Sequence, residues 1–314
     1  MIKANDEQFY EMLEYTDLHT HLTPSFNKDD ITIHRLIGFI VPLTILISMV
    51  ACGVREEQNL RSEKPLVIMA ASSLTDVLTE IGEKFKESHP DVTLAFNFDG
   101  SQRLRTQLLL GAQADIFISA DWKQAKDLEN ANLVLTKAKP FAYNKLSIIV
   151  HEKSGSSPAH SVSNLGDLSN PKIKLVLADK NVPAGKYTRQ MLEDAEHQGD
   201  LGSQFKMTVL NNLISNESSV RAVVQKVSLG VADVGVVYKT DVKENVEHVK
   251  SIPIPDYINP KTAYPVVVLE GSKQYSLAQQ FVSFLYSDHA QSLLVKHQFD
   301  TGTSIPVISQ NIEQ

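Results

Sequence analysis

The stretch 66–85, LVIMAASSLTDVLTEIGEKF, constrains the fold of this chain more than any other. Its first four residues are apolar and predict a buried strand, and apolar residues spaced 3.6 residues apart up to Phe85 predict a helix directly after it. Ser73 stands at the expected N-cap, with Asp76 three residues later in an approximate capping box. Because a helix start leaves amide N–H groups unpaired and carries partial positive charge, this junction is suited to binding a small oxyanion.

Two more junctions of the same kind follow. The segment 92–98 alternates like a strand and leads through a small polar turn to Ser101, where a second helix is expected to begin. The segment 114–121 is a short buried strand, and its last residue, Asp121, is the expected cap of a third helix. This alternation of strands and helices is typical of an α/β fold.

A second set of alternating elements begins near residue 144. Pro183 can open one helix of this set, the polar segment 216–219 can cap another, and Tyr238 ends a buried strand. The pattern predicts strands over 144–151, 173–178, 207–210 and 231–238.

The last part of the chain is expected to return to the first set of elements. Pro253 and Pro255 interrupt the chain, after which 264–269 predicts a strand and 275–295 predicts a helix. The simplest architecture has two α/β lobes joined by two or more crossings. Lobe I is predicted over 65–143 and 256–314, and lobe II over 144–255.

If the two lobes face each other, the junctions between strands and helices line one cleft, where ligands bind in open α/β sheets. A dianion held there by several neutral donors is reasonable, because a hydrogen bond to a charged group contributes about 1.5–3 kcal/mol. Any one serine at a helix start more often only caps the helix, and a tyrosine at a strand end more often only packs. The combination is more specific than its members, which are Ser73, Ser101, Pro183-Ala184, Ser219-Val220 and Tyr238.

The single cysteine, Cys52, ends an apolar run that follows His34 and Arg35. The run is shorter than the about 20 residues of a membrane-spanning helix and has the shape of a secretory signal. Its Val-Ala-Cys ending resembles the lipobox of bacterial lipoproteins, in which the cysteine receives the lipid. A lipoprotein-type signal peptide is therefore predicted over 34–52, with a buried helix or an ordinary signal as the alternatives.

The composition of the two segments beside this signal predicts what each of them is. Residues 53–64 are predicted to be a charged linker between lipid and domain. Residues 1–33 are acidic and polar, which fits a signal peptide badly, so they are predicted to be a disordered or mis-assigned extension. Their His19-Thr20-His21 has the His-x-His pattern of amidohydrolases, but the barrel and further ligands that this pattern needs do not follow.

The formal net charge of -7 excludes some functions. Phosphate backbones are bound mainly through clustered Lys and Arg, and no basic stripe is present, so no nucleic-acid partner is expected. The same net charge would repel an anion. An anion site must therefore act through local dipoles and hydrogen bonds rather than through overall charge.

Six motifs, in this order and spacing, give the chain a family resemblance: MAASSLTDVLTEIGEKF, GAQADIFISAD, VPAGKYT, SSVRAVV, GVVY and YPVVVLEG. Over about residues 65–308, the chain resembles the periplasmic molybdate-binding proteins of bacterial and archaeal ABC transporters. The resemblance implies a two-lobed α/β fold of the type II periplasmic-binding-protein class, with a ligand cleft between the lobes. It also implies an extracytoplasmic monomer, periplasmic or lipid-anchored to the membrane, that serves a permease and an ATPase.

The same resemblance implies the ligands of the oxyanion, molybdate or tungstate. No cofactor and no directly bound metal ion is expected, because the metal is held as its oxyanion. Carried over motif by motif, the implied ligands fall on five residues. The hydroxyl ligands are Ser73 and Ser101, which also contribute their amides, and Tyr238; the backbone-amide ligands are Ala184 and Val220. Two departures from the family pattern are the charged Arg103 after the second serine and a short stretch before VPAG.

The sequence favours other functions less strongly. An enzyme is disfavoured because no P-loop, G-x-S-x-G elbow or H-E-x-x-H motif is present. The stronger rival is a binding protein for another anion, such as sulfate, phosphate or a small organic anion. A carboxylate binder would be expected to use an arginine fork, and Arg103, Lys186 and Arg221 lie just past the implied ligands.

Overall fold

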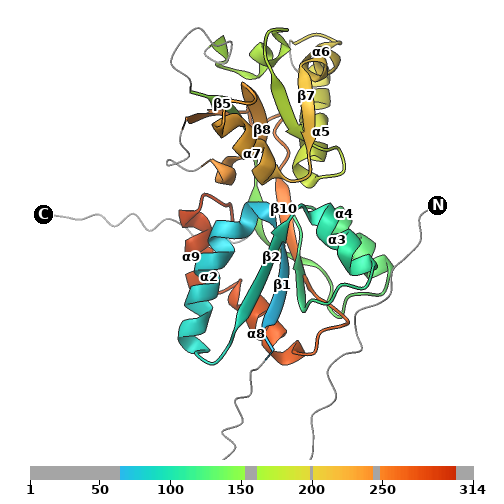
Figure 1. The fold of residues 1–314 in the computed structure, drawn as a ribbon, viewed down its shortest axis with the longest axis vertical. Helices are drawn as coiled ribbons and strands as arrows, with labels where there is room; N and C mark the ends of the chain where they lie inside the picture. Colours follow the sequence, from blue (N-terminus) through green and yellow to red (C-terminus); the bar gives the residue numbers. More distant parts are fainter. Residues whose placement is uncertain (1–63, 153–160, 199–200, 243–247, 302–314) are drawn as a thin grey trace, which may run out of the picture. The chain divides into compact units, whose positions relative to one another are not determined.

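The computed structural model of the chain describes residues 64–152, 161–198, 201–242 and 248–301, all within one compact unit, Glu63–Gln314. The predicted N-terminal extension, the signal segment and Cys52 lie outside the described residues, as does the linker apart from Lys64. The described part is built from two five-stranded sheets with helices packed on them (Figure 1). Among the described residues, no helix combines the length and the apolar character needed to cross a bilayer.

The first sheet has the strand order β2-β1-β3-β10-β4. Its strands are β1 (Leu66–Ala71), β2 (Leu94–Asp99), β3 (Ile116–Ile118), β4 (Lys139–Asn144) and β10 (Thr262–Val268). β1 is parallel to both β2 and β3, while β10 runs antiparallel between β3 and β4. β1, β3 and β10 lie inside the sheet and are buried almost throughout, which explains why they are continuous apolar runs rather than alternating ones.

The second sheet has the strand order β7-β6-β8-β5-β9. Its strands are β5 (Leu146–His151), β6 (Leu175–Ala178), β7 (Leu213–Glu217), β8 (Val234–Tyr238) and β9 (Val249–Pro253). β6, β7 and β8 are parallel, and β5 is antiparallel to both β8 and β9. The chain enters this sheet between Asn144 and Leu146 and leaves it between Pro253 and Thr262, so the predicted crossings are present.

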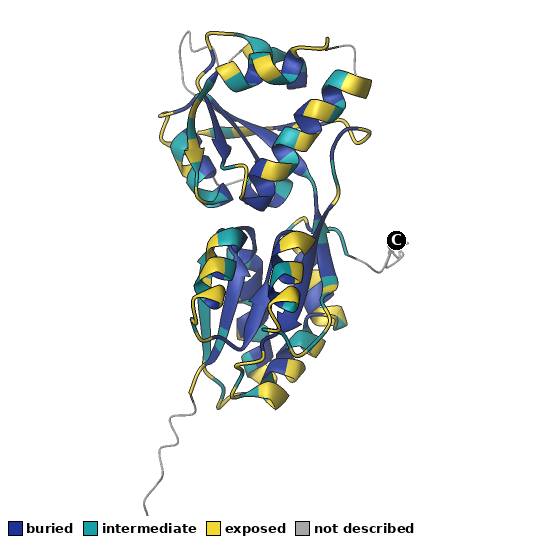
Figure 2. Cartoon of the chain, turned by 90° about the vertical axis from the view of Figure 1, so that its right-hand side faces the viewer, coloured by how far each residue is buried: buried dark blue, intermediate teal, exposed yellow. Residues whose placement is uncertain are grey.

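The helices turn their apolar faces to the sheets and their polar faces outward (Figure 2). α2 illustrates the pattern, since Val77, Leu78, Ile81 and Phe85 are all buried, and burying a side chain of this size contributes about 1.5–3 kcal/mol. With the first sheet lie α2 (Thr75–Ser88), α3 (Ser101–Leu109), α4 (Trp122–Asn130), α8 (Tyr275–Phe284) and α9 (Asp288–Lys296). With the second sheet lie α5 (Pro183–Gln198), α6 (Phe205–Asn211) and α7 (Val220–Ser228).

The prediction of a strand over 207–210 was wrong, because these residues belong to α6. The run Met-Thr-Val-Leu looks like a strand by itself, but the buried residues are Phe205 and Val209, which are four apart and lie on one helical face. The third strand of the second sheet is β7, which begins at Leu213 and follows this helix.

The single helix predicted over 275–295 is divided into α8 and α9. The break is set by Ser287, whose hydroxyl accepts a hydrogen bond from the Ala290 amide and caps the second helix. Strands β4 and β9 were not predicted. Both are edge strands, and β9 contains Pro253, which is tolerated at an edge but weakens a strand prediction.

Candidate functional site

A small cavity lies between the carboxyl ends of first-sheet strands and the starts of helices from the second sheet. All five predicted ligand residues line it, namely Ser73, Ser101, Ala184, Val220 and Tyr238. The other lining residues are Ala71, Ser72, Asp99, Gly100, Ala120, Val182 and Pro183. The cavity volume is about 10 Å³, far below the about 300–1,000 Å³ of pockets for drug-sized ligands, so the cavity excludes ligands of that size.

Ser73 does not cap α2, which corrects the prediction from sequence. It lies in a short 3-10 turn, Ser72–Leu74, that precedes the helix, and its hydroxyl oxygen is 3.0 Å from the hydroxyl of Tyr264. That tyrosine also accepts a hydrogen bond of 3.2 Å from the Asn144 amide. If Tyr264 gives its single proton to Ser73, the serine's own hydrogen is left to point into the cavity.

Ser101 is the first residue of α3 and is also buried. Its hydroxyl oxygen accepts a hydrogen bond of 3.1 Å from the Ala120 amide. The hydroxyl hydrogen is again left for another acceptor, because a serine has one donor and two acceptor positions. Ser101 can therefore donate into the cavity, and Ser73 can donate into the same space when Tyr264 is the donor of the bond that the two share.

The second sheet contributes the starts of two helices. α5 begins at Pro183 and α7 at Val220, so the amides of Ala184 and Val220 belong to first turns, whose N–H groups have no partner inside the helix. A cap was predicted within 216–219, and the structure shows that it is Ser219, whose hydroxyl accepts from the Ala222 amide at 3.4 Å. A side chain on Gly185 would overlap the carbonyl oxygens of Ala178, which ends β6, and of Asp179, so only glycine lets α5 start this close to the strand.

Tyr238 ends β8 and is 1% exposed. Its hydroxyl is buried and has no hydrogen-bond partner among the described residues. Burial, assisted by the neighbouring Tyr264, raises the pKa of Tyr238 well above its ordinary value of 10.0, so the group remains a proton donor. A buried hydroxyl without a partner is costly, and here it lines the cavity where an anion could accept its hydrogen.

The three cations near the cavity are engaged elsewhere. Arg103 pairs with Asp99 at 3.2 Å, Lys186 with Asp121 at 3.3 Å, and Arg221 with Asp76. None of the three is among the lining residues in the part of the chain that the structure describes. The buried Asp121 also caps α4 as predicted, by accepting from the Gln124 amide at 3.1 Å.

Two residues that hold the site were not found from the sequence. Tyr264 was recognised only as part of a strand, and Asn144 only as the start of another. Tyr264 lies 191 positions from Ser73, and Asn144 lies 120 positions from Tyr264. No local sequence pattern could therefore pair them.

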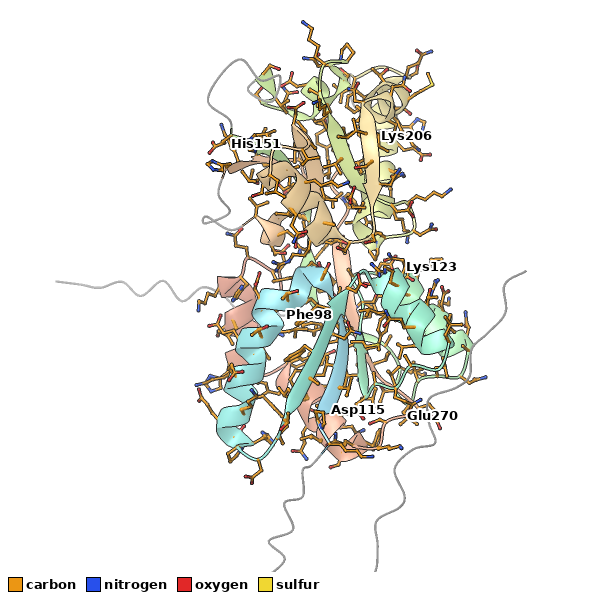
Figure 3. All side chains as sticks on the ribbon, in the orientation of Figure 1. Phe98, Asp115, Lys123, His151, Lys206 and Glu270 are labelled. Atoms are coloured by element: carbon orange, nitrogen blue, oxygen red, sulfur yellow. The ribbon has the colours of Figure 1, made fainter. Side chains whose placement is uncertain are left out.

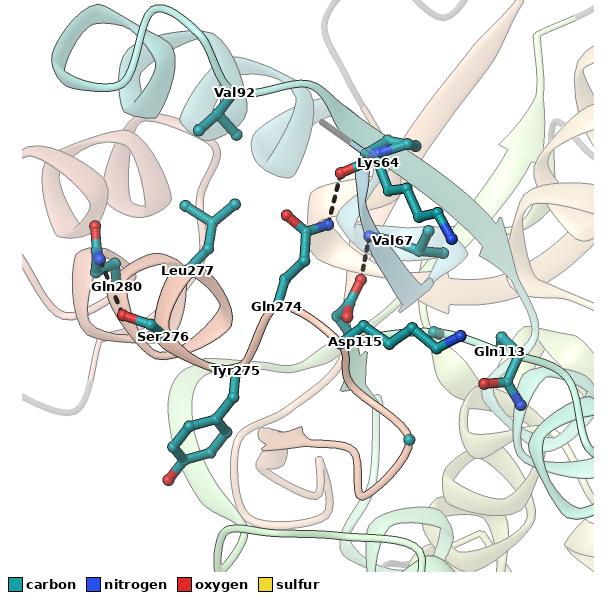
Figure 4. A pocket seen from close by; sticks show the side chains of 14 residues that line it. Lys64, Val67, Val92, Gln113, Asp115, Gln274, Tyr275, Ser276, Leu277 and Gln280 are labelled. Atoms are coloured by element: carbon teal, nitrogen blue, oxygen red, sulfur yellow. Dashed lines mark hydrogen bonds between the residues drawn. The ribbon is translucent and has the colours of Figure 1, made fainter. Parts of the chain in front are cut away.

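A larger pocket lies at the opposite end of the first sheet, among Lys64, Val67, Asp115, Gln274 and neighbours (Figure 4). In Figure 3, Asp115 marks this end, while Phe98 lies toward the other end of β2. Two of the polar side chains here are already paired, since Asp115 accepts from Val67 and Ser272, and Gln274 donates to the Lys64 carbonyl. It is also the amino end of β1, whereas ligands of open α/β sheets bind at carboxyl ends.

The described residues contain no cluster of three or more histidine, cysteine or acidic side chains suited to a metal ion. The chemistry available in the small cavity is thus that of hydroxyl and amide donors. Such a set can bind a small oxyanion, and the one carboxylate in the lining, Asp99, is neutralised by Arg103.

Comparison with known proteins gives the family. Residues 66–300 match the family model described as bacterial extracellular solute-binding protein. The molybdate-binding protein ModA of Mycobacterium tuberculosis is 31% identical over 265 residues, which cover 83% of this chain and 95% of that protein. The putative ABC transporter substrate-binding lipoprotein YvgL of Bacillus subtilis is 30% identical over 267 residues, 83% of this chain and 96% of the relative.

A solved structure agrees with the sequence matches. The substrate-binding domain of a putative molybdenum ABC transporter from Clostridium difficile superposes with a TM-score of 0.56 at 30% identity. The superposition covers 76% of this chain and 99% of that domain. The predicted two-lobed α/β periplasmic-binding-protein fold is confirmed, and the chain belongs to the family of bacterial extracellular solute-binding proteins, which it shares with the ModA proteins.

Proposed function

We propose that this chain captures molybdate or tungstate outside the cytoplasm and delivers it to the permease and ATPase of an ABC transporter. It binds its ligand without transforming it, so we do not assign it an enzymatic activity. The observation that carries the proposal is the buried Tyr238 hydroxyl, which lacks a partner and lines the same small cavity as Ser73 and Ser101. The names of relatives add support, since both the ModA protein and the C. difficile domain are described as molybdate or molybdenum proteins.

The ligand is held in this proposal by neutral groups. The hydroxyls of Ser73, Ser101 and Tyr238 and the first-turn amides of Ala184 and Val220 act as donors to the oxygens of the anion. Each bond to a charged acceptor makes a net contribution of about 1.5–3 kcal/mol after the exchange of hydrogen bonds with water, so five donors together favour binding. The paired state of Arg103, Lys186 and Arg221 supports this assignment over an arginine fork.

The size of the cavity predicts which anions bind. Molybdate and tungstate should raise the midpoint of thermal unfolding of the chain from residue 65 onward, because a ligand that binds only the folded state stabilises it. Sulfate has the same charge and shape but shorter bonds and cannot reach all donors at once, so it should give a much smaller shift. A thermal-shift series with the four anions molybdate, tungstate, sulfate and phosphate is the measurement.

Competition titration sharpens this test. Sulfate that displaces molybdate at equal concentration would exclude selection by size and would favour the alternative of a sulfate- or phosphate-binding protein. No shift with any of the four anions would remove the oxyanion proposal altogether and leave a small organic anion as the rival.

The position of the protein outside the cytoplasm is also part of the proposal. We infer that Cys52 carries a lipid and anchors a monomer to the membrane. The relative YvgL is described as a lipoprotein, and the segment 34–52 has the pattern of a lipoprotein signal. The proposed limits of the two lobes remain 65–143 with 256–314 for lobe I and 144–255 for lobe II.

The anchor can be tested in a bacterial host that expresses the full chain. The wild-type protein should incorporate a labelled fatty acid and remain with the membrane fraction, whereas Cys52→Ala should do neither. Retention of the label by Cys52→Ala would show that another residue carries the lipid. A parallel sample with Ser48→Ala, four residues upstream, controls for damage to export.

A further inference from the structure

One side chain connects the two halves of the candidate site directly. Arg221 lies on α7, next to Val220, and therefore belongs to the helix that the second sheet supplies. Its guanidinium nevertheless reaches the first-sheet side, where Nε donates to the Ser72 carbonyl at 3.2 Å and a terminal N–H donates to the carboxylate of Asp76. Both acceptors flank Ser73, one residue before it and three residues after it.

The pair is partly shielded from solvent. The side chains of Arg221 and Asp76 are 35% and 30% exposed, so their attraction is screened less than that of a fully exposed surface pair. The hydrogen bond to the Ser72 carbonyl fixes the backbone that carries Ser73 as well as its neighbours. The contact of Arg221 thus holds the backbone that carries Ser73, and not only side chains around the cavity.

Contacts on the other side of the cavity also connect the two halves of the site. Gln102 donates to the Ser218 carbonyl at 2.9 Å, and Arg103 donates to the Ser218 hydroxyl at 3.2 Å. A Cβ on Gly100 would overlap that same carbonyl, so the two segments approach as closely as a glycine allows. The starts of α3 and α7 are therefore fixed against each other, as Arg221 fixes the starts of α2 and α7.

We propose that Arg221 is a positioning residue for the anion site, holding the Val220 amide and Ser73 at the separation at which both can donate to one bound oxyanion. The inference rests on the proposed function, because it assumes that those two residues bind the same anion. Arg221 does not itself contact the anion. Its guanidinium is paired with the carboxylate of Asp76, and Arg221 does not line the cavity.

The direction in which one substitution changes the anion affinity distinguishes this role from long-range electrostatics. Asp76→Asn removes a negative charge near the site, so simple charge repulsion predicts tighter binding of a dianion. The positioning role predicts weaker binding, because Arg221 loses its anchor. We expect Asp76→Asn and Arg221→Gln each to lower molybdate affinity by about 5- to 150-fold, the range of ordinary coupling between two sites.

Three further variants complete the design. The double variant should bind no more weakly than Arg221→Gln alone, since both changes break the same contact. Arg221→Lys, which keeps the charge but loses the fork geometry, should recover part of the affinity. The matched control is Lys226→Gln on the same helix, whose 35% exposed side chain pairs with Glu217 within the second-sheet side and should leave affinity unchanged.

The measurement is isothermal titration of molybdate into each variant, with the thermal midpoint of the ligand-free protein recorded alongside. Tighter or unchanged binding by Asp76→Asn, or equal losses in Lys226→Gln and Arg221→Gln, would overturn the positioning role while the wild type still binds. A wild-type protein that binds no molybdate would instead overturn the proposed function, and the inference with it.

Discussion

Replacing Tyr238 with phenylalanine is expected to weaken molybdate binding by about 10- to 150-fold, the equivalent of one hydrogen bond to a charged group. The hydroxyl is buried in the cavity wall and has no partner among the described residues, so the bound anion would supply its acceptor. In the ligand-free protein the same substitution removes an unsatisfied buried group. The free energy of unfolding without ligand should therefore be unchanged or higher in Tyr238→Phe.

Tyr238→Phe is therefore expected to lower the affinity for molybdate without lowering the stability of the ligand-free protein, and measuring both quantities tests the role of the hydroxyl. Titration calorimetry gives the affinity, and urea unfolding of the ligand-free protein gives the stability. Tyr286→Phe is the control, because the hydroxyl of this exposed tyrosine donates to the Lys139 carbonyl outside the cavity. If Tyr238→Phe loses stability and keeps its affinity, the hydroxyl has a structural role and is not a ligand.

The parts of this molecule that could be predicted from its sequence are those with a local cause. The helix starts at Pro183 and Val220 are set by a proline and by a capping serine, and both signals lie within a few residues of the effect. The apolar runs of β1 and β8 likewise announce buried strands. The resemblance then placed five residues in one cleft, and the structure brings all five to one cavity.

The remaining features depend on contacts between distant segments. Ser73 has the sequence signature of an N-cap, yet its hydroxyl contacts Tyr264, whose position depends on how β10 inserts between β3 and β4. The pairing of Arg221 with Asp76 spans 145 positions and is equally invisible to local patterns. A sequence pattern could show that these residues are polar and near the site, but not which partner each of them has.

Asp241 is expected to lower the stability of the protein as pH rises from about 4 to about 7. This residue follows Tyr238 in the short 3-10 helix Lys239–Asp241 and is 4% exposed. One carboxyl oxygen accepts from the Tyr238 amide at 3.1 Å, and the other has no partner among the described residues. Burial raises the pKa of Asp241 from 3.8 to about 7, although Arg221 on α7 opposes the rise and Asp76 on α2 adds to it.

The sign follows from proton binding. Between pH 4 and pH 7 the folded protein keeps a proton on Asp241 that the unfolded chain has released, so raising the pH favours unfolding. Below this window both states are protonated, and above it both are ionised and the full penalty applies. For a pKa difference of about three units, the penalty is on the order of 4 kcal/mol.

Asp241→Asn removes this titration while preserving an oxygen that can accept from the Tyr238 amide. Relative to wild type, its free energy of unfolding in urea should rise by about 2–3 kcal/mol between pH 5 and pH 8, the part of the window that these two conditions span. Asp167→Asn is the control of opposite character, because backbone amides lower the pKa of Asp167 and its carboxylate is ionised in both states above pH 5. Its difference from wild type should therefore be the same at both pH values. A constant difference for Asp241→Asn as well would mean that this carboxyl is already ionised in the folded protein at pH 5, stabilised by Arg221 strongly enough to overcome its burial.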